Sequence, residues 1–102
     1  GAPVYMAPEQ FEEVVYTAQT DVYALGVILH EMLTGRRPFA YQSIAAHIAE
    51  ITRSDPPSLR TIARGIPEEL DRICLKALAR DPAQRYATAD ALADDLRAFL
   101  TT

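Results

Sequence analysis

The stretch at residues 20–35 constrains the fold of this chain more than any other. Its apolar residues do not share one stripe, so a helix here would be hydrophobic nearly all round and would belong in a core. The residues concerned are Val22, Tyr23, Leu25, Val27, Ile28, Leu29, Met32 and Leu33. Thr20 is expected to cap the helix, Asp21 to complement its dipole, and Gly35 to close it in the left-handed conformation. We predict a buried central helix over residues 20–34, with Met32 in the core.

The same helix is too short to be a membrane span. At about 1.5 Å per residue, it falls well short of a bilayer core of about 30 Å, and Arg36-Arg37 follow at once. We therefore expect no membrane insertion.

The composition is that of an ordinary globular domain. Apolar residues make up 49% of the chain, enough for a single modest core. Ten Lys and Arg against fourteen Asp and Glu give a net charge of −4, and no basic run exceeds Arg36-Arg37, which argues against a nucleic-acid partner. The single cysteine, Cys74, cannot form an internal disulfide, and the sequence shows no secretory leader. We expect a reducing, cytoplasmic setting.

The rest of the chain has helical signals and no strand-like alternation, so the predicted fold class is all-α. The helix starts are marked by Pro8, Ser43, Pro67 and Thr88. The expected helices cover residues 8–13, 43–52, 67–79 and 88–100. Residues 53–65 have no strong period and are expected to form an irregular connection.

Two histidines and the cysteine receive no functional role. His30 and His47 lack a second ligand at metal spacing and are expected to be partly buried or surface residues. Cys74 lies on the inner face of its expected helix without a nearby His or Lys, so it should be an inert small hydrophobe.

Four motifs follow one another along the chain. They are Gly1-x-Pro3-x-Tyr5-Met6-Ala7-Pro8-Glu9, Asp21-Val22-Tyr23-Ala24-Leu25-Gly26, Gly35-x-x-Pro38-Phe39 and Asp81-Pro82-x-x-Arg85-Tyr86. Their order and spacing resemble the C-terminal lobe of a serine/threonine protein kinase domain, of the eukaryotic-like type found in bacteria. The resemblance implies that the chain is the helical part of the α+β kinase fold. Residues 1–13 would end the activation segment, 20–34 form the central helix and 43–100 the peripheral helices.

The resemblance also implies roles for particular residues. The loop before Glu9 would form the pocket for the substrate residue that follows the phosphorylated one. Its candidate peptide contacts are Tyr5, Met6, Ala7 and Pro8. Glu9 would pair with Arg85 and tie this loop to a remote turn, and Asp21 would hold the backbone of the catalytic loop. Taken singly, Glu9 and Arg85 would be solvated charges and Asp21 a dipole-complementing residue, but their shared context favours the functional interpretation.

The parts that carry phosphoryl transfer in this family do not occur in the sequence. These are the Gly-rich loop, the Lys–Glu pair, the catalytic Asp and Asn, and the metal-binding Asp. We therefore expect no catalytic residue, bound cofactor or metal in this chain, ATP and Mg²⁺ in the complete parent domain, and no phosphate transfer by the isolated residues. Ala2 stands where serine/threonine-specific members usually carry a hydroxyl residue.

Three hypotheses follow from these observations. The first is the substrate-binding part of a serine/threonine kinase, whose partners are a protein or peptide substrate and the upstream kinase portion. The second is a non-catalytic, pseudokinase-like or scaffold binding module, and the third is an unrelated helical domain. Because short helices cannot cover every side of the central helix, we also expect a bare apolar flank and either self-association or marginal stability.

Overall fold

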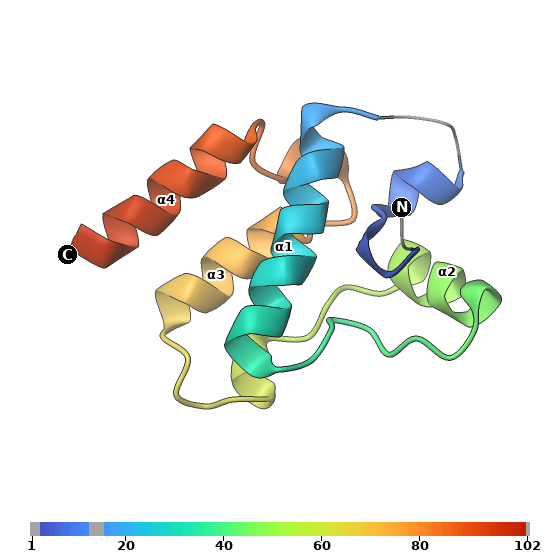
Figure 1. Cartoon of the computed structure of the whole chain (residues 1–102), viewed down its shortest axis with the longest axis horizontal. Coiled ribbons are helices and arrows are strands. Elements are labelled where there is room, and N and C mark those ends of the chain that lie inside the picture. Colours follow the sequence, from blue (N-terminus) through green and yellow to red (C-terminus); the bar gives the residue numbers. More distant parts are fainter. Residues whose placement is uncertain (1–2, 13–15, 102) are drawn as a thin grey trace.

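The computed structural model describes residues 3–12 and 16–101, which form helices and connections without a β-strand among them (Figure 1). The α-helices are α1 (Ala18–Thr34), α2 (Ile44–Arg53), α3 (Glu68–Ala77) and α4 (Ala89–Thr101). Short 3₁₀ turns occur at η1 (Pro3–Tyr5), η2 (Pro8–Phe11), η3 (Leu59–Thr61) and η4 (Pro82–Gln84). The predicted all-α class is confirmed.

No helix in the described ranges combines the length and the apolar character needed to cross a membrane.

The start of α1 differs from the prediction, whereas its end agrees with it. Thr17, not Thr20, is the N-cap: its hydroxyl accepts from the Thr20 N–H at 3.3 Å, and the Thr20 hydroxyl accepts from the Thr17 N–H at 3.2 Å. This reciprocal capping box starts the helix at Ala18, two residues earlier than expected. Gly35 adopts φ 76° and closes the helix as predicted.

One flank of α1 packs against α3 in the core. Val22 is fully buried, and Tyr23 and Val27 are buried as well. A methyl group added at Gly26 would lie 3.0 Å from the Ala77 Cβ, so glycine at this position lets the two helices approach closely. This buried flank matches the prediction of a central core helix.

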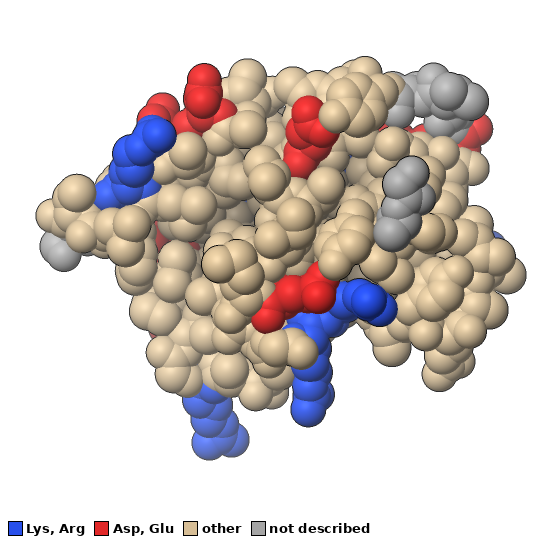
Figure 2. Space-filling view, viewed as in Figure 1, with Lys and Arg blue, Asp and Glu red and all other residues tan. Residues whose placement is uncertain are grey.

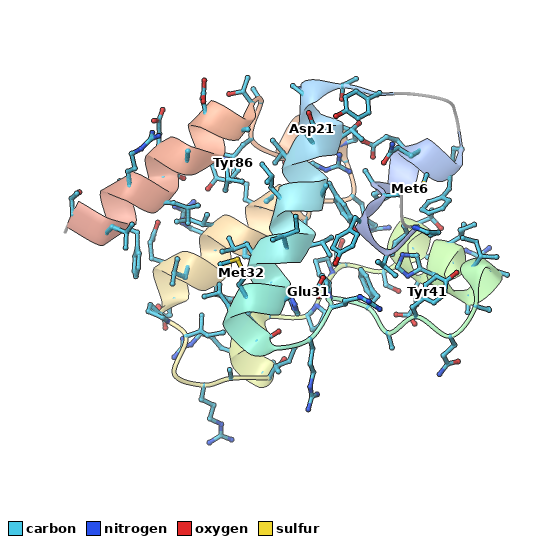
Figure 3. The ribbon with its side chains drawn as sticks, viewed as in Figure 1. Met6, Asp21, Glu31, Met32, Tyr41 and Tyr86 are labelled. Atoms are coloured by element: carbon cyan, nitrogen blue, oxygen red, sulfur yellow. The ribbon has the colours of Figure 1, made fainter. Side chains whose placement is uncertain are left out.

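The opposite flank of α1 is open. Leu25 and Ile28 are 40% and 44% exposed, and Met32 is 77% exposed (Figure 3). The assignment of Met32 to the core was therefore wrong, because α4 borders this side of α1 without covering the Met32 side chain. With Leu29 and part of α4, these side chains line an apolar groove, over which charged side chains are sparse (Figure 2). The expected bare apolar flank is confirmed.

Helix α2 lies apart from the other three helices, beside the N-terminal segment (Figure 1). It packs against η2, and its buried residues are His47 and Ile51. Ser43 caps it as predicted, accepting from the Ala46 N–H at 3.1 Å. This arrangement places α2 and η2 together at one end of the molecule.

The connection between α2 and α3 is more ordered than its sequence indicated. Leu59, at the start of η3, is fully buried in the core. The Asp71 carboxylate accepts from the Ser58 hydroxyl at 2.6 Å and from the Leu59 N–H at 2.7 Å. One side chain of α3 thus fixes a loop that comes more than ten residues earlier in the chain.

The two histidines and the cysteine are all buried. His30 is fully buried, with its Nδ1 2.6 Å from the Arg36 carbonyl oxygen, and His47 is 3% exposed, so both lie deeper than expected. Cys74 is fully buried, and burial raises the pKa of its thiol to about 12. The thiol therefore stays protonated at neutral pH, in agreement with the predicted inert role.

Candidate functional site

A bidentate ion pair joins two segments that are far apart in the sequence. Arg85 donates from Nη1 to Glu9 Oε2 at 2.7 Å and from Nη2 to Glu9 Oε1 at 2.8 Å. The Arg85 side chain is fully buried and that of Glu9 is 17% exposed. The structure therefore brings together the two residues that the family resemblance paired, across a separation of 76 residues.

Arg85 uses its whole guanidinium at this site. Besides the two bonds to Glu9, its Nε donates to the Ala79 carbonyl at 2.7 Å, and its terminal nitrogens donate to two further carbonyls at 3.1 Å. These last acceptors are the carbonyls of Gln19 and Arg80. All five guanidinium N–H groups are thus satisfied, which is what a buried arginine requires.

Two neighbours from α1 complete the surroundings of the pair. The Thr20 hydroxyl donates to Glu9 Oε2 at 3.2 Å, and the Arg85 guanidinium lies 4.9 Å from the centre of the Tyr23 ring. Thr20 was predicted only as a cap, so its contact with Glu9 was missed. Burial raises the pKa of Tyr23 to about 12, so its hydroxyl is neutral beside the pair.

The pKa of Glu9 reports the balance of forces at the pair. Burial by itself raises this pKa, but the hydrogen bond and the positive charge of Arg85 lower it, with help from Thr20 and from backbone hydrogen bonding. The net result lies below the usual value of 4.5. Glu9 is therefore a carboxylate at neutral pH, and the site is an ion pair.

Short turns hold both partners in position. On the Glu9 side, Pro8 starts η2, and the Ala7 N–H donates to Gln10 Oε1 at 2.9 Å. On the Arg85 side, Asp81 caps η4 by accepting from the Ala83 N–H at 3.0 Å. Each charged side chain thus leaves a locally capped turn, which limits the conformations it can sample.

The four candidate peptide contacts divide into two pairs. Ala7 is fully buried in the core and Pro8 is buried at the start of η2. Tyr5 and Met6 are partly exposed, and Tyr5 packs against the cluster that contains Ala7. In this structure, a molecule in solvent can reach the side chains of Tyr5 and Met6 but not that of Ala7.

Asp21 lies outside the Glu9–Arg85 pair. It is exposed in the first turn of α1, where its carboxylate accepts from the Tyr16 hydroxyl. Within the described ranges, the Asp21 side chain forms no hydrogen bond or ion pair with another candidate residue. The prediction that concerns Ala2 lies outside the described residues.

Glu31 was not singled out in the sequence. One of its carboxylate oxygens is buried and has no hydrogen-bond partner within the described part of the chain. The residue borders an open depression of about 430 Å³, together with Arg36, Phe39 and Tyr41 (Figure 3). A single Glu within a helical run carries no sequence signal for such a position.

The described residues do not fit a metal site. Residues 3–12 and 16–101 contain no group of three or more His, Cys, Asp or Glu that could hold a metal ion. Protein kinases use ATP with Mg²⁺ as the phosphoryl donor. We assign no step of that transfer to these residues.

Comparison with known proteins places the chain in a family. Residues 1–96 match the protein kinase domain, so the chain belongs to that family, and its helices correspond to part of the C-terminal lobe.

Several bacterial kinases are similar to the chain. It is 41% identical over 101 residues to the tyrosine-protein kinase MasK of Myxococcus xanthus, covering 99% of this chain and 16% of that protein. It is 36% identical over 97 residues to the serine/threonine-protein kinase PrkC of Bacillus subtilis, covering 95% of this chain and 15% of PrkC. It is 36% identical over 99 residues to the serine/threonine-protein kinase PknL of Mycobacterium tuberculosis, covering 97% of this chain and 25% of PknL. The chain thus spans a quarter or less of the length of these relatives.

Proposed function

We propose that the chain is the substrate-binding part of a serine/threonine protein kinase, which transfers the γ-phosphoryl group of ATP to protein serine or threonine. The observation that carries this proposal is the buried, bidentate Glu9–Arg85 pair. The pair fixes the loop immediately before Glu9 to the η4 turn. A loop that presents a peptide in one geometry has to be held in place in this way. The family match and the two serine/threonine kinase relatives described above support the reaction class.

Within this proposal, each candidate residue has a role set by its exposure. Tyr5 and Met6 contact the peptide, because their side chains are partly exposed. Ala7 and Pro8 shape the pocket from beneath, because they are buried. Glu9 is a positioning residue that acts through Arg85.

Asp21 receives a conditional role. Its carboxylate is exposed at the start of α1 and already accepts one hydrogen bond, from Tyr16. To hold the backbone of a catalytic loop, as the family resemblance implies, it would accept from that backbone as well or in place of Tyr16. A carboxylate has room for several donors, so both arrangements are chemically accessible.

The apolar groove between α1 and α4 is proposed to receive the upstream portion of the kinase domain. Leu25, Ile28 and Met32 are exposed there, and an open apolar surface of this kind is usually covered by a partner. In the isolated chain the same face would drive self-association. The lone, buried Cys74 agrees with a cytoplasmic location, which we include in the proposal.

A chimeric kinase tests the proposed function. The 102 residues replace the aligned segment of Bacillus subtilis PrkC, and phosphorylation of a protein substrate is measured. We expect the chimera to retain phosphoryl transfer, and Arg85→Ala to lower kcat/KM strongly. Arg97→Ala, in an exposed ion pair with Asp94, is the matched control and should leave kcat/KM unchanged. A folded chimera that transfers no phosphate would overturn the proposal.

The isolated chain provides the complementary measurement. We expect no transfer of labelled phosphate from ATP to a peptide, because the groups that carry the transfer in this family are not among its residues. The control is Asp21→Ala prepared in the same way. Turnover above that control would show that the chain works differently from its family.

Sedimentation of the isolated chain tests the role of the groove. Met32→Glu places a charge on the most exposed of the groove side chains named above, at 77% exposure. It should shift the chain toward monomer without reducing its helix content, whereas Thr101→Glu, at an exposed position near the end of α4, should not. Equal association of all three forms would assign self-association to another surface.

A non-catalytic scaffold module is the second candidate. The observation that favours it is Ala2, which stands where serine/threonine-specific kinases usually carry Thr or Ser. In the chimera, Ala2→Thr discriminates between the two functions. If activity appears only with Thr at this position, the natural chain belongs to a binding module.

A further inference from the structure

One buried imidazole lies where three segments meet. His47 projects from α2 and is 3% exposed. The Phe11 ring of η2 meets it edge-on at 6.3 Å between centroids, and the Tyr41 ring, from the connection before α2, lies 5.3 Å away. The three rings therefore belong to η2, to the connection and to α2.

Neither ring nitrogen of His47 forms a hydrogen bond of normal geometry within the described part of the chain, and the Pro3 backbone offers the ring at most a weak one. His30 differs in this respect, because its Nδ1 lies 2.6 Å from a carbonyl oxygen. A buried neutral imidazole with so little hydrogen bonding loses most of the hydrogen bonds that water would give it, and a protonated one loses far more. The environment of His47 is thus much more costly for the charged ring than for the neutral one.

The cost of protonating His47 affects one particular contact in the fold. Helix α2 packs against η2, and it buries only His47 and Ile51 among its own residues. Figure 1 shows α2 beside the N-terminal segment and away from α3 and α4. A change at His47 therefore acts on the contact that holds α2 and residues 3–11 together, more than on the α1–α3 core.

Groups from several segments influence the pKa of His47. Burial is the largest influence and lowers the pKa of His47, and Arg37 in the connection before α2 lowers it too. Weak hydrogen bonding to the Pro3 backbone and the negative charge of Glu50, one turn along α2, raise it, but the net result lies below the usual value of 6.5. Tyr41 and Phe11 face the imidazole with their aromatic rings.

The lowered pKa of His47 determines how its protonation changes the stability of the fold. The unfolded chain has an ordinary His, so it binds the proton more readily than the folded chain does. The contribution of His47 to stability is fully present above about pH 6.5 and is lost as the pH falls from there toward the lower folded pKa.

We propose that His47 is a proton-operated latch: the neutral ring holds α2 against residues 3–11, and protonation releases them from one another. Residues 3–11 include Tyr5 and Met6, so release would also free the loop proposed to contact the peptide. That consequence rests on the proposed function, whereas the release itself does not.

Hydrogen exchange followed by NMR on the 102-residue chain tests the latch. Between about pH 7.5 and about pH 5, corrected for intrinsic exchange, we expect amides of α2 and of residues 3–11 to lose protection while those of α3 keep it. His47→Phe retains an aromatic ring that cannot titrate, and it should abolish the pH-dependent loss. His47→Gln is the second non-titrating variant, in case phenylalanine does not pack.

Three outcomes would overturn the proposal. The first is the same pH-dependent loss in wild type and in a folded non-titrating variant. The second is a loss that spreads equally to α3, which would indicate global unfolding. The third is a His47 ring that titrates at or above the usual value. None of these depends on phosphorylation, and the PrkC chimera is assayed at one neutral pH, so failure of the latch and failure of the proposed function are distinguishable.

Discussion

Two ion pairs with similar shortest N···O distances differ in their surroundings. Arg85 reaches Glu9 at 2.7 Å and Arg97 reaches Asp94 at 2.9 Å. The first pair has side-chain exposures of 0% and 17%, whereas the second has 70% and 75%. The difference teaches that the distance between two charges says little about how much the pair contributes to stability. Exposure to water matters more, because water solvates each charge and weakens the attraction between them.

The buried pair is costly to break rather than strongly stabilising in itself. Removing two charges from water opposes folding, and their attraction offsets that penalty only with good geometry and further hydrogen bonds. Arg85 meets this condition, because all five of its N–H groups have acceptors. The exposed pair makes no such demand, since water solvates either partner when the other is removed.

Removing the buried cation should give the largest effect. Arg85→Ala leaves Glu9 shielded without its partner, so we expect the free energy of unfolding to fall by about 3–5 kcal/mol. Urea denaturation measures this loss, in the longest form of the protein that unfolds in a single cooperative transition. A loss as small as that of Arg97→Ala would show that Glu9 finds water when Arg85 is gone.

Keeping the charge but changing its shape should have an intermediate effect. Arg85→Lys preserves the attraction to Glu9 but cannot make the bidentate bond or reach all the carbonyls that Arg85 serves. We expect a loss of about 1–3 kcal/mol by the same denaturation measurement. Equality with wild type would mean that the fork geometry is unimportant.

Acid should weaken the buried pair through Glu9. Its folded pKa lies below 4.5, so its contribution is present above the unfolded value and is lost as the pH falls through the folded one. The effect should be smaller than that of Arg85→Lys, because a protonated carboxyl still accepts from Arg85. Denaturation midpoints between about pH 6 and pH 3 measure it. Glu9→Gln should lack this component, and an unchanged acid slope in that variant would assign the loss to other carboxylates.

The exposed pair should give the smallest effect. Arg97→Ala breaks a solvated contact within one turn of α4, and we expect a change of less than about 0.5 kcal/mol. Urea denaturation at low and high salt is the check. A larger, salt-dependent loss would mean that the surface pair is better ordered than its exposure indicates.

Local features of the fold could be predicted from the sequence. Ser43, Pro67 and Thr88 marked helix starts to within about two residues, and Gly35 marked the end of α1, because capping depends on a few neighbouring atoms. The start of α1 was placed at Thr20 because two threonines share that turn and either can cap. The structure assigns the cap to Thr17.

Features that depend on distant segments were harder. An all-round apolar helix does not reveal which flank its neighbours will cover, so Met32 was assigned to the core while it is in fact exposed. The burial of His47 and the tie from Asp71 to the Ser58 turn likewise depend on segments brought together by folding. The Glu9–Arg85 pairing was predicted only through the resemblance to protein kinases, because no local pattern links residues so far apart.

The tie from Asp71 to Ser58 and Leu59 also has a consequence for proteolysis. The connection it holds carries Arg60 and Arg64, two exposed sites at which trypsin could cut. A protease needs an extended, detached segment, and here the η3 backbone is hydrogen-bonded to α3 while Leu59 is inserted in the core. Cleavage after Arg60 therefore requires local opening, and its rate under native conditions becomes a measure of how firmly α3 holds this loop.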